Sequence, residues 1–532
     1  MRTSPEGNAS ELGEATGVTS EAAPLPEVEE EGPAPHGDGN PPTSLYSTDL
    51  APTSLAKRTW TAYHFAALWF GMAQCVPTYG LTSGLLAAGM NWWQALLTIL
   101  LGNLIILVPM LLIAHGGARY GIPFSVLCRA SFGVRGANIP VGLRGLVACA
   151  WFGIQTWIGG QAINRLLIFA FPAWKTNDDG EIVCFFAFWV LNMAVIWTGM
   201  NALRRLVAWT APAVLLSTLF LLFSMFERAH GLGPIIAQPG FTRSGEWINV
   251  WPILLAAQIG FWSTLSLNMS DFTRYAKNQR AQLVGQAIGL PTAMTLFAGL
   301  GMAITSATAS VYLHPIWDPV TLLTQPEFGN PFVVIWSLLT IVLATLTVNV
   351  AANLIAPAFG FAHLWPQKIY YRIGASIAGA LAVLMQPWFL LEQTGDLIAK
   401  FLVGYSALLG PIAGILICDY WLLRRARLNV DDLFLASGRY RYRNGFNQLA
   451  LSALLAGIFP NLPGFILNVQ AAKLGIPSYE LIAQQDPSSK LAWHLADDFY
   501  GFAWLLGFVV SFCVYAILMR AFEREQYEAD RR

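Results

Sequence analysis

The chain has 532 residues, of which 12% are charged and 55% hydrophobic, and its 31 basic side chains balance its 31 acidic ones. Soluble domains carry about 25% charged residues, and a chain without net positive charge has no field that attracts nucleic acid. The composition therefore excludes an ordinary soluble enzyme, a nucleic-acid-binding protein and a disordered chain, and it indicates a polytopic membrane protein.

Residues 1–50 differ from the rest of the chain. They are rich in Glu and Pro and contain a single basic residue, Arg2. No apolar core of about 7–15 residues follows Arg2, as a secretory signal peptide would require. We expect residues 1–50 to form a disordered, solvated tail that stays in the cytoplasm.

Twelve later segments are apolar over about the 20 residues that a bilayer-spanning helix needs. They cover residues 62–89, 92–115, 140–172, 184–200, 207–227, 249–271, 281–310, 331–362, 372–390, 397–422, 447–468 and 499–520. We therefore predict an all-α membrane protein with 12 transmembrane helices and both termini on one side.

The distribution of Lys and Arg supports this topology. With a cytoplasmic N-terminus, 24 of the 31 basic residues fall in inner segments and 6 in outer ones, while Arg165 lies inside the third span. Basic residues are enriched in cytoplasmic loops of membrane proteins. The alternating bias therefore favours 12 spans with cytoplasmic N- and C-termini.

The first and sixth spans carry features that interrupt helices. Pro77 lies near the middle of span 1 and lacks the N–H that continues a helix. A plain proline kink and an unwound segment beside a cavity are both compatible with it. Span 6 has a central hydroxyl run, Ser263-Thr264-Leu265-Ser266. Because spans 1 and 6 are five helices apart, spans 1–5 and 6–10 are candidates for inverted repeats around a transport site.

Polar side chains also lie at membrane depth. Trp151 and Gln155 of span 3 are four residues apart and face the same way. Thr345, Asn349 and Asn353 of span 8 repeat at the same spacing, with Thr347 off that stripe. Each amide could form an interhelical hydrogen bond or line a wet cavity. For span 8 the cavity is favoured, because several polar groups lie on one helix.

The charged residues near span ends are expected to be solvated or paired: Asp271 and Arg274 after span 6, and Asp419 after span 10. A cavity lined by two indoles and two amides suits a flat, neutral, polar ring, because indoles stack on ring faces and amides both donate and accept hydrogen bonds. No cofactor is expected, and no CxxC, HExxH, GxxxxGK[ST], GxSxG or GxGxxG motif is found.

Several long runs resemble the nucleobase:cation symporter-1 family of hydantoin, allantoin, uracil and other nucleobase permeases, over about residues 45–520. The runs are RTWTAYHFAALWFGMAQCVPTYG (58–80), YGIPFSVLCRASFGVRGANIP (120–140), WFGIQTWIGG (151–160), FWSTLSLNMSDFTRYAK (261–277), LATLTVNVAANLIAPA (343–358) and LGPIAGILICDYWLLRR (409–425). This resemblance implies the leucine-transporter fold, with two inverted five-helix repeats, two extra helices and discontinuous helices 1 and 6.

The implied division of the chain is a tail (1–50), a first repeat (51–230), a second repeat (245–425), helices 11 and 12 (440–522) and a cytoplasmic C-terminal tail (523–532).

The resemblance also implies site residues. Trp151, Gln155, Trp262 and Asn353 match the family's substrate-binding residues, and Cys75 stands where family members often have an amide. The sodium-binding carbonyls match Gly71, Gln74 and Ala344, and one hydroxyl matches Thr347. The second hydroxyl falls on Val348, which has no side-chain oxygen. Because hard cations need oxygen ligands, coupling to H⁺ or to Na⁺ is expected about equally.

We therefore expect a secondary active transporter of the plasma membrane, a functional monomer in contact with lipid, that imports a small heterocycle such as allantoin, hydantoin, uracil, a purine or a related nucleobase. The alternatives are a channel, which would need rings of like residues in a symmetric oligomer, and a membrane-embedded enzyme acting on a heterocycle.

Overall fold

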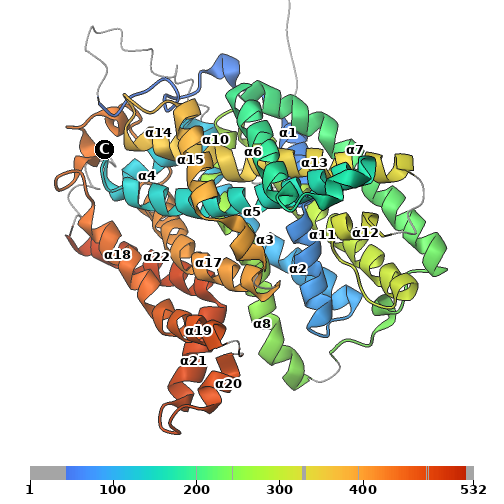
Figure 1. Cartoon of the computed structure of the whole chain (residues 1–532). Coiled ribbons are helices and arrows are strands. Elements are labelled where there is room, and N and C mark those ends of the chain that lie inside the picture. Colours follow the sequence, from blue (N-terminus) through green and yellow to red (C-terminus); the bar gives the residue numbers. More distant parts are fainter. Residues whose placement is uncertain are drawn as a thin grey trace, which may run out of the picture.

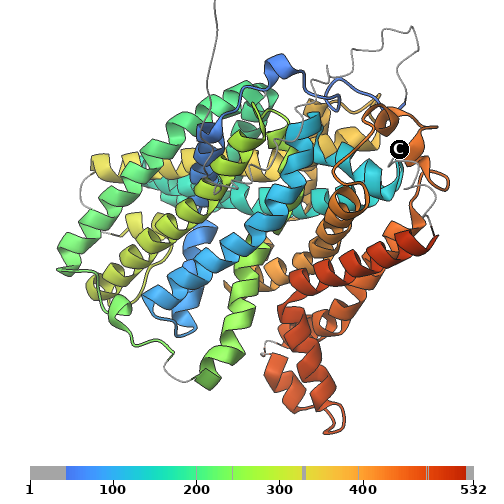
Figure 2. The ribbon, with the colours of Figure 1, turned by 180° about the vertical axis from the view of Figure 1, so that it is seen from behind.

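A computed structural model describes residues 44–522 except 199, 242–243, 326–330, 393–394, 475 and 477. Most of the expected tail at 1–50 and all of the tail at 523–532 lie outside the described residues. The described chain folds into helices joined by short loops, and α17 to α22 pack along one side of the other helices (Figures 1 and 2).

Nine helical segments among the described residues are long and apolar enough to cross a membrane. They are Trp92–Tyr120 (α3), Asn138–Ala170 (α5), Gly180–Thr198 (α6), Pro212–Ala229 (within α7, Met200–Ala229), Gln279–Tyr312 (α11), Pro331–Leu364 (α13 to α14), Leu402–Leu423 (from within α17, Gly395–Ile417), Gln448–Ala471 (α18 to α19) and Ala503–Phe522 (α22). Each coincides with an expected span, with ends displaced by a few residues.

The other three expected spans contain shorter helices. Span 1 is divided into α1 (Ala62–Ala73) and α2 (Val76–Ala87), span 6 into α8 (Ser244–Phe261) and α9 (Ser263–Asn268), and span 9 contains α15 (Tyr371–Leu384). Two of the long segments are composite: η5 (Cys418–Leu423) follows α17, and η8 (Phe459–Asn461) joins α18 (Gln448–Ile458) to α19 (Leu462–Leu474). The remaining elements are η1 (Leu55–Lys57), α4 (Phe124–Phe132), η2 (Pro172–Thr176), η3 (Ile235–Ala237), α10 (Ser270–Thr273), α12 (Pro319–Leu323), α16 (Pro387–Glu392), η6 (Asp431–Phe434), η7 (Arg439–Arg441), α20 (Ser478–Ala483) and α21 (Lys490–Gly501).

The interruption of span 1 follows from its sequence. Pro77 is at the second position of α2, where its missing N–H would have no helical partner in any case. Gln74 and Cys75 are the two non-helical residues, and the Thr78 hydroxyl donates to the carbonyl of Ala73 at 2.7 Å. The hydroxyl thus satisfies a carbonyl that the helix end leaves without its usual partner.

The interruption of span 6 is one residue long, at Trp262 (φ −102°, ψ 6°). Hydroxyls again bind the freed carbonyls. Ser263 and Tyr405 both donate to the carbonyl of Gly260, at 2.8 and 2.9 Å, and Ser266 donates to the carbonyl of Ser263 at 2.7 Å. The hydroxyl run that marked this span is therefore used to stabilise non-helical backbone inside the membrane.

Span 8 differs from the regular helix that was expected. Between α13 (Pro331–Val348) and α14 (Ile355–Leu364), residues Asn349–Leu354 form a π-helical turn, η4. Such a turn inserts an extra residue into the helix and is frequent at functional sites. The spacing-of-four stripe of Thr345, Asn349 and Asn353 therefore does not continue as one straight face.

Both ends of the described chain lie beside α4. The N–H of Thr53 donates to the carbonyl of Gly121 at 2.9 Å, immediately before α4. The Asn447 amide, at the start of α18, donates to the carbonyl of Ser131 in α4 at 2.7 Å and to the Tyr515 hydroxyl of α22 at 3.2 Å. We call this end of the molecule the α4 end.

The charged residues near the span ends are buried rather than solvated. Asp419 is fully buried and forms an ion pair with Arg424 at 2.8 Å, so the paired alternative is the correct one for it. Asp271 is 1% exposed and accepts from the N–H of Phe124 at 2.8 Å. Arg274 donates to the Thr53 hydroxyl and to the carbonyls of Asp49 and Ala51. These bonds hold the first described residues against the α4 end.

Candidate substrate cavity and cation site

Four spans line a cavity among the helices: spans 1 and 6, which are interrupted, span 8, which contains the π-helical turn, and span 3, which is a regular helix. The space between atoms in and around it is about 340 Å³, and we call it the central cavity. Its lining residues are Met72, Cys75, Trp151, Gln155, Phe261, Trp262, Thr264, Leu265, Val348, Ala352 and Asn353. They come from the α1–α2 break, α5, the α8–α9 break and the α13–η4 junction.

The central cavity brings together all five residues expected to bind substrate: Cys75, Trp151, Gln155, Trp262 and Asn353. The backbone breaks explain why these residues converge, because Cys75 and Trp262 are themselves non-helical residues of the two interruptions. Phe261 and Thr264 were not assigned to the cavity from the sequence. The available signals were the position of Phe261 next to Trp262 and the membership of Thr264 in the hydroxyl run of span 6.

The aromatic side chains of the cavity meet edge to face. The ring centroids of Trp151 and Phe261 are 5.9 Å apart at 89°, and those of Phe261 and Trp262 are 4.8 Å apart at 74°. Trp69 of α1 supports Trp262 from another side, with centroids 5.1 Å apart at 88°. Such packing fixes the planes of the two indoles relative to the cavity.

The two asparagines of span 8 have different roles, because Asn349 joins two helices and Asn353 lines the cavity. Asn349 is fully buried and donates to the carbonyl of Phe152 at 3.2 Å and to the Thr156 hydroxyl at 2.9 Å, so it joins η4 to α5. Asn353 lines the cavity and donates to the Asn349 carbonyl oxygen at 3.1 Å. The interhelical alternative therefore holds for Asn349, and the cavity alternative holds for Asn353.

Gln155 lines the same cavity, and its side-chain oxygen can accept a further hydrogen bond. Among the residues that the structure describes, the buried side-chain oxygen of Gln155 has no hydrogen-bond partner, and neither has the buried indole N–H of Trp262. An unpaired buried polar group costs free energy that a ligand can recover. The cavity therefore offers both a free acceptor and a free donor beside its aromatic surfaces.

The lining side chains of the central cavity carry no charge, but a charged residue lies against two of them. Arg144 of α5 is 1% exposed and donates to the carbonyls of Thr264 at 3.4 Å and Ala352 at 3.3 Å. It also donates to the Asn268 side-chain oxygen at 2.7 Å. The sequence analysis counted Arg144 among the basic residues of the inner segments. Arg144 is two helical turns before Trp151, and this spacing could have placed it on the cavity face of span 3.

The candidate sodium ligands lie on two helices that pack together. Gly71 is in α1, Gln74 follows it, and Ala344 and Thr347 are in α13. The Thr347 hydroxyl donates to the carbonyl of Leu343 at 2.8 Å and lies 3.4 Å from the Thr210 hydroxyl. Its oxygen keeps lone pairs for a cation, whereas Val348 supplies only methyl groups and borders the central cavity.

The central cavity holds little free space in this conformation. The centre of a water molecule can occupy only about 30 Å³ of it, which is room for about two or three waters. A heterocycle therefore enters only if the surrounding helices or side chains move.

The sequence model of one permease family, described as permeases for cytosine/purines, uracil, thiamine and allantoin, matches residues 52–493. The chain belongs to this family. The permease is 40% identical to the purine-uracil permease NCS1 of Arabidopsis thaliana over 438 residues, which are 80% of this chain and 73% of the relative. It is 36% identical to the allantoin permease of Bacillus subtilis (strain 168) over 489 residues, or 90% and 93% of the two chains.

Among solved structures, the permease resembles Mhp1, a nucleobase-cation-symport-1 family transporter, in a closed conformation with bromovinylhydantoin bound. The TM-score is 0.72 at 23% identity, covering 92% of this chain and 99% of that one. A second structure of Mhp1, facing inward, gives a TM-score of 0.70 at 24% identity, covering 91% and 95%. This likeness confirms the predicted leucine-transporter fold. The permease is thus a multi-pass membrane transporter and not an enzyme.

Proposed function

We propose that the permease imports a small, neutral, planar nitrogen heterocycle, such as allantoin, hydantoin, uracil or a related nucleobase. The observation that carries this proposal is the convergence of Trp151, Trp262, Gln155 and Asn353 on one uncharged cavity. The printed names of the two relatives, a purine-uracil permease and an allantoin permease, support the same substrate class.

In the proposed complex, the indoles of Trp151 and Trp262 stack on the two faces of the ring. Gln155 and Asn353 bind its polar edge, because amides match the alternating carbonyl and N–H groups of these heterocycles. Cys75 lies at the cavity wall, where its thiol is a weaker hydrogen-bonding group than an amide. Fewer hydrogen bonds from span 1 should make selectivity depend more on Gln155 and Asn353.

Transport is proposed to be symport with a cation, H⁺ or Na⁺, by alternating access. The small free space of the central cavity and the breaks in spans 1 and 6 support a mechanism in which one repeat moves against the other. One elementary charge moving down ~100 mV supplies ~2.3 kcal/mol, enough for roughly fifty-fold accumulation. Gly71, Gln74, Ala344 and Thr347 are the proposed cation ligands.

The proposed setting is the plasma membrane, with both termini cytoplasmic and the α4 end therefore facing the cytoplasm. The proposed units are the repeats at 51–230 and 245–425 and the helix pair at 440–522, and each monomer carries a complete cavity. The charge bias toward one side supports this orientation.

The test begins with the purified permease in detergent. Its thermal stability is measured with hydantoins, allantoin, uracil, cytosine and purines, and at least one should raise the melting temperature. Uptake of that ligand, labelled, into vesicles should saturate, exceed the outside concentration and stop when the cation gradient is dissipated. Uptake that neither saturates nor accumulates would instead indicate a channel, and the absence of any stabilising heterocycle would contradict the proposed substrate class.

A further inference from the structure

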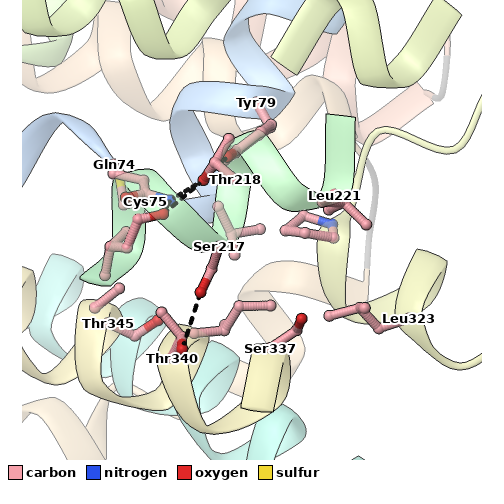
Figure 3. A pocket seen from close by; sticks show the side chains of 15 residues that line it. Gln74, Cys75, Tyr79, Ser217, Thr218, Leu221, Leu323, Ser337, Thr340 and Thr345 are labelled. Carbon is pink, nitrogen blue, oxygen red and sulfur yellow. Dashed lines mark hydrogen bonds between the residues drawn. The ribbon is translucent and has the colours of Figure 1, made fainter. Parts of the chain in front are cut away.

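Among the described residues, no carboxyl or imidazole group lines either of the two spaces that Cys75 borders at the α1–α2 break. One is the central cavity. Figure 3 shows the other, where the labelled polar side chains carry amide, hydroxyl or thiol groups and the Gln74 amide is bonded to the Thr218 hydroxyl. If the coupling cation is a proton, a carboxyl or imidazole outside these linings must bind it.

Two carboxyl groups among the described residues are buried, and they differ in how their charge is balanced. Asp419 is fully buried and Asp271 is 1% exposed. Asp419 forms its ion pair with Arg424 and also accepts from the hydroxyls of Ser131 and Tyr515, each at 3.0 Å. The charge of Asp419 is therefore paired and hydrogen-bonded, as a structural carboxylate requires.

Asp271 has fewer groups to balance its charge. Its Oδ1 accepts from the N–H of Phe124 at 2.8 Å, and its Oδ2 accepts from the side-chain nitrogen of Asn268 at 3.4 Å, which is long for a hydrogen bond. No basic side chain in the described part of the chain forms an ion pair with it. A buried carboxyl whose charge is incompletely paired can take up a proton instead.

Charged and titratable groups of several elements act on the Asp271 carboxyl. The guanidinium groups of Arg144 in α5 and Arg274 after α10 attract its negative charge, whereas burial opposes that charge. Cys128 of α4 and Tyr371 of α15 are the other titratable groups that its charge affects. Helix α3 faces α10 with a glycine and an alanine, which do not titrate. Because these effects oppose one another, the carboxyl can exchange a proton.

The buried imidazole of the described residues is less suited to hold a proton. His363 is 3% exposed, and its Nδ1 lies 3.3 Å from the Arg129 guanidinium, which can only donate to it. A protonated His363 would place two positive charges side by side. Asp271 is therefore the better candidate.

The hydrogen bonds around Asp271 indicate which oxygen takes the proton. The N–H of Phe124 occupies a lone pair of Oδ1. Arg144 can only donate, so the side-chain oxygen of Asn268 must face Arg144, at 2.7 Å, and the NH₂ group of Asn268 must face Oδ2 of Asp271. A proton on Oδ2 places a donor opposite a donor. Protonation therefore weakens the hydrogen bond between Asn268 and Asp271.

Asn268 connects this carboxyl to the wall of the central cavity. It lies between Asp271 and Arg144, and Arg144 also donates to the carbonyls of Thr264 and Ala352, which line the cavity. A change at Asp271 thus reaches the cavity wall through two hydrogen-bonded side chains.

We propose that Asp271 binds the coupling proton, and that the proton and the heterocycle each strengthen the binding of the other. A proton from water forms an O–H bond at Oδ2 and neutralises the carboxylate. Asn268 is then held less firmly, Arg144 can shift, and the central cavity can widen around a ring. When the proton returns to water, the Asn268 hydrogen bond forms again. This proposal rests on the proposed heterocycle transport and assigns its coupling ion.

The first experiment needs no heterocycle. Infrared difference spectra of the purified full-length permease in choline chloride, between pH 8 and pH 5, record the C=O stretching band that a carboxyl gains on protonation. Asp271→Asn should lack one buried-carboxyl component of this band. Asp497→Asn is the matched control, because Asp497 of α21 also accepts from an asparagine amide, that of Asn468 at 2.7 Å. Identical spectra of wild type and Asp271→Asn would overturn the proposal.

The second experiment measures the coupling by calorimetric titration with allantoin and uracil across pH 5 to 8 in choline chloride. Titrations in two buffers of different ionisation enthalpy give the number of protons taken up on binding. Wild type should take up protons and bind about fivefold or more tightly at pH 5 than at pH 8, as reciprocal coupling requires. Asp271→Asn mimics the protonated carboxyl, so it should take up no protons and bind at every pH as wild type does at pH 5. Asp497→Asn should behave as wild type.

Proton uptake and pH dependence that persist in Asp271→Asn would overturn the proposal and indicate another group, as would pH-independent binding by wild type. Should Asp271→Asn fail to fold, Asn268→Ala keeps the carboxyl and removes its connection to Arg144. This variant should keep the infrared band, and its affinity should change by less than about twofold with pH. A full pH response in Asn268→Ala would contradict the coupling. If neither heterocycle binds wild type, the proposed function fails while the infrared test of Asp271 still decides whether it takes up a proton.

Discussion

Arg144 donates a hydrogen bond to the side-chain oxygen of Asn268 at 2.7 Å, next to the backbone that lines the central cavity. The same guanidinium reaches the carbonyls of Thr264 and Ala352. One side chain of α5 therefore joins the second half of span 6 to the π-helical turn of span 8. Thr264 and Ala352 both line the cavity, so the hydrogen bonds of Arg144 hold two parts of the cavity wall together.

We predict that Arg144→Met opens the central cavity toward the α4 end. The variant loses the bonds to α9 and η4, and each hydrogen bond from a charged donor contributes about 1.5–3 kcal/mol. Cys75, which is 5% exposed, reports on the opening. In a Cys513→Ser background, which removes the exposed thiol, Arg144→Met should increase the rate of maleimide labelling at Cys75 at least fivefold.

The matched comparison for this experiment is Arg144→Lys, which keeps the charge but cannot reach three acceptors in a fork. Its labelling rate should lie between those of wild type and Arg144→Met. Equal labelling rates in all three proteins would show that Arg144 does not hold the cavity closed.

Trp262→Ala should weaken heterocycle binding about five- to tenfold or more, because one stacking face is worth about 0.5–1.5 kcal/mol beyond its buried area. Trp262→Phe should retain part of the affinity. Trp209 of α7 is 80% exposed and supplies the control, since Trp209→Ala removes an indole that does not line the cavity. The measurement is a binding isotherm for the purified proteins, and unchanged affinity in Trp262→Ala would contradict stacking.

Asn353→Leu and Asn349→Leu should fail in different ways. Asn353 lines the cavity, so its loss should abolish binding and leave a folded protein. Asn349 joins η4 to α5 through two hydrogen bonds, so its loss should destabilise the fold by about 1–3 kcal/mol. Thermal unfolding and binding are measured on both variants. If Asn353→Leu unfolds as readily as Asn349→Leu, both amides are structural.

The sequence was sufficient to predict the fold because each feature of the fold leaves a local signal. Long apolar blocks mark the spans, Pro77 marks one break and the hydroxyls around Ser263 mark the other. Trp151, Gln155 and Asn353 were predictable for the same reason, since indoles and amides are unusual at membrane depth. Trp262 and Cys75 were expected only from the resemblance to the family. Arg144 was not recognised, because a basic residue near a span end is ordinarily a loop charge.

The different roles of Asn349 and Asn353 could not be predicted from the sequence either. Their spacing of four predicts that both side chains lie on one face of a regular helix. In the π-helical turn, Asn349 instead contacts α5 and Asn353 lines the cavity.

Arg424→Met should be strongly destabilising, by about 3–5 kcal/mol, because it leaves Asp419 buried without its ion-pair partner. The two side chains are 5% and 1% exposed. The Arg439–Asp432 pair, 3.9 Å apart with side chains 38% and 21% exposed, is the comparison. Exposed pairs contribute about 0–1 kcal/mol, so Arg439→Met should change unfolding little. If Arg424→Met and Arg439→Met change the free energy of unfolding equally, the Asp419–Arg424 ion pair does not stabilise the fold more than an exposed pair does.

The last prediction concerns the coupling ion at the candidate sodium site. Val348 replaces a hydroxyl ligand there, so wild-type heterocycle binding should respond weakly to sodium. Val348→Thr keeps the branched shape and adds an oxygen next to Thr347. Heterocycle affinity, titrated with sodium against choline at constant ionic strength, should become more sodium-dependent in this variant.

Three outcomes of that titration are informative. A strong sodium effect already present in wild type would show that another oxygen completes the shell, and the adjacent Thr345 or a water is then the first to examine. No sodium effect in wild type, together with uptake that a protonophore abolishes, would identify the proton as the coupling ion. A Val348→Thr variant that binds its heterocycle as wild type does and gains no sodium response would contradict the assignment of Gly71, Gln74, Ala344 and Thr347 as cation ligands.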